Sequence, residues 1–147
     1  MSTLFKQLEP AEPGIELPDL NTLLDAITFN DQGLIPAIAQ QFDSGEVLMM
    51  AWMNREALDE TLRTGQVCYY SRSRGKLWRK GESSGQQQRL KSAALDCDGD
   101  TLLVQVDQTG PACHSGRRSC FYIELADNRV EINAQPLIDP AELYGKA

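Results

Sequence analysis

The sequence has a single histidine, no C-x-x-C pair and no long apolar run, and each absence excludes a class of protein. Without C-x-x-C, a thiol redox protein of the thioredoxin type and a zinc finger or ribbon are disfavoured. No apolar segment approaches the roughly 20 residues that span a bilayer, which predicts no membrane contact. The N-terminal residues lack a basic start followed by an apolar stretch. We therefore expect no secretory signal and a cytoplasmic protein.

Excess positive charge is also missing. The chain has 14 Lys and Arg against 21 Asp and Glu, a net charge of −7 at pH 7, which argues against nucleic acid as a partner. The basic residues are nevertheless concentrated, because residues 72–80 hold five of them and no acid. Such a patch on an acidic protein indicates a small anionic ligand, most simply a phosphate ester. A solvated basic turn is the alternative.

The apolar pattern predicts one α+β domain, mainly antiparallel β-strands with two short helices. Residues 1–18 hold three of the seven prolines, so we expect an extended N-terminal extension before the domain proper at residues 19–135. The tail, residues 136–147, has room for one more helical turn. Helices are expected from Pro18 and over residues 54–63, and strands at residues 35–42, 47–52, 67–71, 77–79, 87–98, 101–107, 120–125 and 130–133.

Residues 96–120 hold three of the four cysteines, the histidine and three alternate aspartates. Soft thiolates and hard carboxylates prefer different metals, so this segment predicts two kinds of ion. On a strand, Asp96 and Asp98 would point to one face and Cys97 to the other, which separates the two sites. With Asp100 they suit Mg²⁺, although a solvent-exposed acidic turn is the simpler alternative. An EF-hand is excluded because the sixth position of such a loop is not glycine.

Cys113 and Cys120 are separated by a loop with glycine and proline that can bend, so both sulfurs could bind one ion. Cys97 could supply a third ligand. Three protein ligands with an open fourth position are typical of catalytic zinc, which lowers the pKa of bound water toward ~7. The alternative is packing, as we expect for Cys68. The H-x-E and C-x-x-C signature of zinc deaminases is absent, and a nucleophile pair of Cys113 with His114 is weak because adjacent side chains point apart.

Six blocks of the sequence, in order over about residues 33–121, carry a resemblance to a known family. They are GLIPAIAQ (33–40), VLMMAWMNREAL (47–58), TG (64–65), YYSRSRGKLWRKGESSG (69–85), DCDGD (96–100) and QTGPACHSGRRSCF (108–121). Together they resemble the phosphoribosyl-AMP cyclohydrolases, which open the purine ring in histidine biosynthesis. One mild departure is Ser84, where the family is associated with threonine.

The resemblance implies an intertwined homodimer with the active site at the subunit interface and two metals, Zn²⁺ and Mg²⁺. It implies an enzyme that uses zinc to hydrolyse the N1–C6 bond in the adenine ring of phosphoribosyl-AMP. The implied zinc ligands are Cys97 of one subunit with Cys113 and Cys120 of the other, and the implied magnesium ligands are Asp96, Asp98 and Asp100.

The ring opening needs a proton shuttle, and His114 is the candidate catalytic residue because it adjoins a zinc ligand and titrates near neutrality. Orienting the loop or binding a phosphate is its alternative role. A zinc-stabilised dimeric module that binds a phosphorylated nucleotide without catalysis is the competing function. Residues expected to bind substrate are Arg72, Arg74, Trp78, Lys80, Glu82, Ser83, Arg117 and Arg118, although Trp78 would suit the core equally well.

Overall fold

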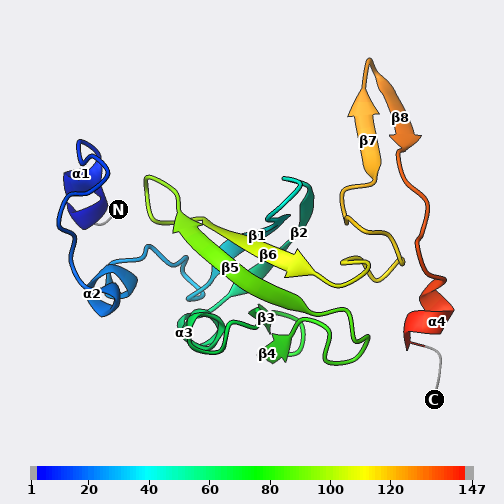
Figure 1. Ribbon diagram of the computed structural model, residues 1–147, viewed down its shortest axis with the longest axis horizontal. Coiled ribbons are helices and arrows are strands. Elements are labelled where there is room, and N and C mark those ends of the chain that lie inside the picture. The colour runs from blue at the N-terminus through cyan, green and yellow to red at the C-terminus, as the bar shows by residue number, and fades with distance from the viewer. Residues whose placement is uncertain (1–2, 145–147) are drawn as a thin grey trace.

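The computed structural model describes residues 3–144, which form a small central sheet with short helices around it (Figure 1). The order of its strands is β2 (Val47–Met53), β1 (Ile35–Gln41), β6 (Leu102–Gln108) and β5 (Gln88–Leu95). The inner strands β1 and β6 run parallel, and each outer strand is antiparallel to its inner neighbour. The predicted α+β class is confirmed, and the sheet is mixed, because one of its strand pairs is parallel.

The helix α3 (Arg55–Thr64) follows β2 and lies where the sequence predicts it. The Asn54 side chain accepts a hydrogen bond from the Ala57 amide at 2.8 Å and so begins the helix. Gly65 ends it in the left-handed conformation with φ 77°, and its amide donates to the Thr61 carbonyl. Local capping chemistry therefore fixes both ends of this helix.

The N-terminal region departs from the prediction. Residues 3–8 form α1 (Thr3–Leu8) instead of an extended lead, and residues 1 and 2 lie outside the described residues. Phe5 is 5% exposed and packs against Gly99, where any side chain would collide with its ring. This packing orders the segment despite the nearby prolines. The other short helices are α2 (Leu20–Asp25), as predicted after Pro18, and α4 (Pro140–Tyr144) in the tail.

The hydrophobic core joins the sheet to α3 and to the strand that follows it. On β1, the buried residues alternate with half-buried ones, as a strand with one core face requires. The strand β6, expected at residues 101–107, alternates in the same way. The buried residues of these two strands include Ile35, Ala37, Ala39, Leu102, Val104 and Val106.

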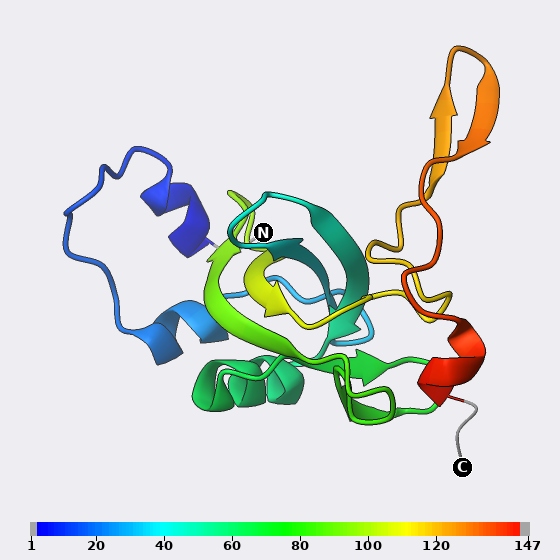
Figure 2. The same ribbon diagram turned by 45° about the vertical axis from the view of Figure 1, so that its right-hand side comes forward.

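Two hairpins complete the fold. The first joins β3 (Cys68–Ser71) to β4 (Lys76–Arg79), and the second joins β7 (Ile123–Ala126) to β8 (Arg129–Ile132). Figures 1 and 2 both show the second hairpin extending away from the sheet, at the end opposite α1 and α2. In the described part of the chain, no helix has the length and apolar character needed to cross a bilayer.

Candidate active site

Two of the predicted metal ligands, Cys113 and Cys120, lie together in the loop that follows β6. The Cys120 amide donates to the Leu48 carbonyl at 2.7 Å, which ties this end of the loop to β2. Cys113 is buried, with 5% of its surface exposed. The Cys120 residue is exposed, but its sulfur is partly enclosed and lies against Cys113, and both effects raise the pKa of Cys120 to about 12. The structure thus brings two free thiols to one place.

Hydrogen bonds from Ser115 stabilise the deprotonated form of Cys113. The Ser115 hydroxyl donates to the Cys113 sulfur at 3.1 Å and its amide at 3.5 Å. Burial alone would raise the pKa of Cys113, but these hydrogen bonds, the Cys120 thiol and the charge of Lys80 outweigh it and hold the pKa below the ordinary value. A thiol whose deprotonated form is stabilised is a suitable ligand for a soft metal ion.

Lys80, expected to bind a substrate phosphate, is a buried cation beside the thiol pair. It is 7% exposed, and its ammonium group donates to the Ala112 carbonyl at 2.5 Å. Burial lowers the pKa of Lys80, while Cys120 and Cys113 act in the opposite direction. In this position the ammonium group favours the deprotonated form of either thiol.

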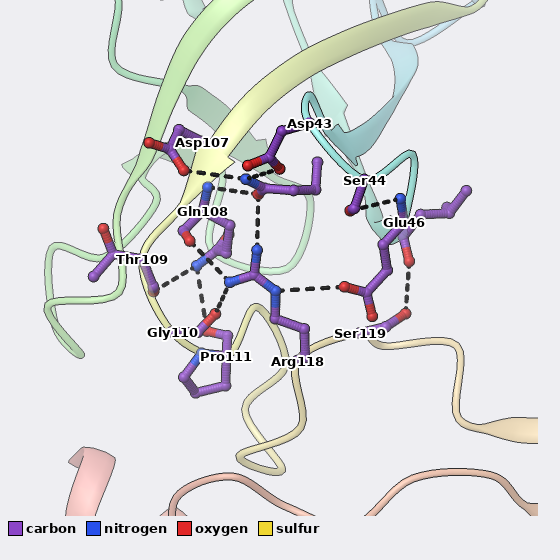
Figure 3. Close-up of polar contacts among 12 residues, drawn as sticks. Asp43, Ser44, Glu46, Asp107, Gln108, Thr109, Gly110, Pro111, Arg118 and Ser119 are labelled. Atoms are coloured by element: carbon purple, nitrogen blue, oxygen red, sulfur yellow. Dashed lines mark hydrogen bonds and ion pairs between the residues drawn. The ribbon is translucent and has the colours of Figure 1, made fainter.

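Arg118 fixes the loop that carries the thiols (Figure 3). One guanidinium nitrogen donates to the carbonyls of Gln108 and Gly110, both at 2.8 Å, and another donates to the Gln41 side chain at 2.8 Å. Its Nε lies 3.5 Å from Glu46. Through these hydrogen bonds Arg118 joins the loop to β1 and β6. Because its N–H groups are already occupied, the geometry favours a structural role over the expected contact with phosphate.

An open hollow of ≈ 890 Å³ lies between β2 and the β3–β4 hairpin and is lined by aromatic side chains and a cation. The Arg72 guanidinium stacks over the Trp52 ring, 4.9 Å from its centre. Trp78 lines the hollow as well, and the Lys80 ammonium lies 5.8 Å from the centre of its ring. Trp78 therefore connects the hollow to the thiol pair. Its ring also packs against Tyr69, with 5.0 Å between the ring centres, so its expected roles in binding and in the core are compatible.

The remaining predicted substrate residues lie on the surface. Arg117 is held by its own neighbours, because its guanidinium stacks 4.0 Å from the centre of the Tyr122 ring and donates to the Ala134 carbonyl at 2.7 Å. Arg74 contacts the Ser71 hydroxyl through its amide at 3.2 Å. Exposed residues of the predicted set are Arg72, Arg74, Glu82, Ser83 and His114.

The three aspartates do not alternate along a strand, because β5 ends at Leu95. The following residues form a tight turn in which the Asp96 carboxylate accepts hydrogen bonds from the amides of Asp100 and Thr101, at 3.0 and 3.3 Å. Burial raises the pKa of Asp96, but these bonds outweigh it and lower that pKa, while the neighbouring Asp96 carboxyl raises the pKa of Asp100. The argument from strand alternation was therefore wrong. The turn nevertheless places two carboxyl groups side by side, with Asp98 exposed next to them.

Cys97, the third expected zinc ligand, is exposed in the same turn and lines a groove beside α1 and α2. Within residues 3–144, no group of three or more His, Cys, Asp or Glu side chains is arranged to hold a metal ion. One subunit thus offers Cys113 and Cys120 at one place and Cys97 at another. A zinc site with three thiolates would need a second copy of the chain.

Sequence reasoning missed two residues of this site and misjudged a third. Trp52 lines the hollow, and its place in the block at residues 47–58 could have indicated it. Ser115 contacts the Cys113 sulfur, but no sequence pattern predicts that contact. The role of Arg118 as an anchor depends on Gln41, far away in the sequence, and could not be read locally.

Two thiols with perturbed pKa values beside a buried lysine indicate a candidate active site, and the hollow with two tryptophans and an arginine suits an aromatic ligand that carries negative charge. The comparisons with known proteins identify the class further. The model of the family "Phosphoribosyl-AMP cyclohydrolase" matches residues 49–122. The chain therefore belongs to the phosphoribosyl-AMP cyclohydrolase family, and it is an enzyme.

Curated relatives agree over almost the whole chain. A phosphoribosyl-AMP cyclohydrolase of Alkalilimnicola ehrlichii is 70% identical over 141 residues, which is 96% of this chain and 99% of the relative. Those of Chromohalobacter salexigens and Halorhodospira halophila are 66% and 65% identical, over 99% and 97% of this chain and 99% of each relative. The similarity thus extends beyond the segment that the family model matches.

Proposed function

We propose that the chain uses zinc to hydrolyse the N1–C6 bond in the adenine ring of phosphoribosyl-AMP, a step of histidine biosynthesis. Membership of the family supports the reaction. The observation that carries the proposal is the pair of thiols at Cys113 and Cys120, held beside Lys80, whose ammonium group lies 5.8 Å from the ring of Trp78 at the hollow.

The donor set fits zinc. Cys113 has a lowered pKa, and Cys120 lies against it, so the pair offers the soft sulfur ligands that Zn²⁺ prefers. Cys97 of a second copy completes three ligands in a homodimer, which leaves one coordination position open. When bound there, zinc lowers the pKa of water toward about 7. The ligand thiols must stay reduced, which fits the cytoplasmic location that we propose.

The residues around the hollow would position the substrate. Its adenine ring would lie against Trp52 and Trp78, because aromatic faces suit a planar base. Arg72 lies at the same hollow and, with Arg74 nearby, would bind a phosphate group through paired hydrogen bonds. Glu82 and Ser83, exposed in the loop after β4, would contact the ribose hydroxyls or support this shell.

Two proton transfers accompany the ring opening, since the attacking water loses a proton and the departing ring nitrogen gains one. His114 adjoins Cys113 and is exposed, so solvent and ligands have access to it. We propose that it carries one of these protons.

The aspartate turn is proposed as the Mg²⁺ site. Asp96 and Asp100 lie close enough for each to affect the other's pKa, and Asp98 is exposed beside them. A hard cation would relieve their repulsion and accept their oxygens as ligands.

Ultraviolet monitoring of purified protein with phosphoribosyl-AMP, with and without a zinc chelator, tests the proposal. We expect conversion to the opened imidazole product, its loss with the chelator and its recovery when zinc is restored. A zinc-loaded, folded dimer that leaves the substrate unchanged would contradict the proposal. It would then favour the alternative of a module that binds a phosphorylated nucleotide.

A further inference from the structure

The β7–β8 hairpin carries an apolar face with no partner among the described residues. Cross-strand pairing places Ile123 opposite Ile132 and Leu125 opposite Val130, and side-chain alternation directs all four to one face. Leu125 is 74% exposed and Val130 69%. A two-stranded hairpin is marginally stable alone, and a contiguous exposed apolar face marks an interaction surface.

A matching apolar surface lies at the other end of the molecule. α1, α2 and the end of β5 form a groove of ≈ 440 Å³. Its apolar walls include Leu8, Leu20 and Ala94, and Leu20 is 56% exposed. The groove continues to Cys97, which lines it. Figures 1 and 2 show that the hairpin of the same chain lies at the opposite end of the molecule, so it does not fill this groove.

The proposed zinc site connects these two surfaces, and the inference rests on that proposal. Zinc–sulfur bonds of about 2.3 Å place the sulfurs of Cys120 and of a second copy's Cys97 about 4 Å apart. The hairpin begins at Ile123, three residues after Cys120, and three extended residues span at most about 11 Å. In such a dimer the hairpin of one copy would begin near Cys97 of the other, which lines the groove.

We propose that the apolar face of the β7–β8 hairpin docks in the groove between α1, α2 and β5 of a second copy of the chain. By two-fold symmetry the docking is reciprocal, so both hairpins and both grooves are covered in the dimer. The contact would lie next to each zinc site and would hold Cys97 against the thiol pair of the partner.

Photo-crosslinking of the full-length, zinc-loaded protein tests where the hairpin docks. p-Benzoylphenylalanine replaces Leu125 on the apolar face or, as a matched control, Glu124 on the opposite face. Mixing isotopically light and heavy subunits separates crosslinks between copies from those within one copy. We expect Leu125 crosslinks between copies, at α1, α2 or residues 93–95, and at least about tenfold fewer from position 124. Crosslinks that map elsewhere, or none from the dimer, would overturn the docking.

Sedimentation of two double variants tests how much the docked hairpin contributes to the stability of the dimer. Leu125→Ser with Val130→Ser removes apolar side chains that are exposed in a single copy, so folding should persist. We expect the dimer dissociation constant to rise at least about 100-fold, because each dimer loses four buried side chains. Glu124→Ser with Glu131→Ser, on the other face, should change it less than about threefold.

An unchanged dissociation constant in the apolar variant would contradict the docking. Zinc content and turnover, measured on the same samples above the dissociation constant, separate this failure from a failure of the proposed reaction. If crosslinks map elsewhere while zinc-dependent turnover persists, the docking is wrong and the catalytic proposal stands.

Discussion

At the scale of single residues, the four cysteines have different surroundings and different expected roles. Cys68 is fully buried under α3, and its amide bonds the Thr61 hydroxyl at 2.9 Å. Burial, together with Glu60, raises the pKa of Cys68 to about 12, so it carries no thiolate at neutral pH. Cys113 has the opposite character, because Ser115 holds its pKa low. Cys68 fits the packing role expected from the sequence.

Cys113→Ala should therefore reduce turnover of phosphoribosyl-AMP at least about 100-fold, since it removes a proposed zinc ligand. Cys68→Ala is the matched control, and it should keep turnover within a few-fold while lowering stability by about 1–2 kcal/mol. Absorbance kinetics and bound zinc per subunit check both variants. Full activity and zinc content in the Cys113 variant would contradict the assignment.

At the scale of elements, some of the fold could be predicted and some could not. The helix α3 was predictable because Asn54 and Gly65 supply its caps locally. The parallel pairing of β1 with β6 was not, because it depends on contacts between residues far apart in the sequence. Residues 96–98 were misread as the end of a strand, since apolar residues up to Leu95 continue the β pattern without a clear stop.

The loop that carries Cys113 and Cys120 depends on one anchor. Arg118→Lys loses the fork of hydrogen bonds to Gln108, Gly110 and Gln41, because a lysine offers a single donor position. We expect zinc affinity to fall about 10–100-fold, with a lower kcat and little change in KM. Arg117→Lys is the control, as its contacts lie outside this anchor. Competition with a chromophoric chelator measures the affinity, and a raised KM with unchanged affinity would instead support a phosphate contact.

An ion pair joins α3 to β4. Glu60 accepts hydrogen bonds from Arg79 at 2.6 and 2.7 Å, and these lower the pKa of Glu60 below its ordinary value of 4.5. The stabilisation is therefore complete above about pH 4.5 and is lost as the pH falls through the lowered pKa. Glu60→Gln should lower the free energy of unfolding by about 1 kcal/mol at pH 7.

The change of this destabilisation with pH tests the ion pair more directly than its size at pH 7. The difference in unfolding free energy between the native chain and Glu60→Gln should shrink as the pH falls from 6 to about 3. Urea unfolding across that range measures it, with Glu16→Gln, at an exposed position, as control. A difference that stays constant with pH would show that the pair does not contribute through its charge.

At the scale of the whole molecule, the proposed zinc ligands of one copy of the chain lie in two separate places. Cys97 lies in the groove beside α1 and α2, while the thiol pair lies near the exposed β7–β8 hairpin. The sequence indicated the three cysteines as candidate ligands, but their division between two subunits came only from the resemblance, because no local pattern says which cysteines meet in space. Both the divided ligands and the uncovered apolar surfaces favour a two-fold dimer with shared active sites.

Subunit mixing tests this central claim most directly. Cys97→Ser and Cys113→Ser are each expected to be inactive, and their mixed dimer has one site with all three cysteines intact. After refolding an equal mixture together, half of the dimers are mixed, so turnover should recover to about a quarter of the native value. If each active site lies within one chain, or needs no Cys97, the mixture will show only the sum of the separate variants, and the shared site is wrong.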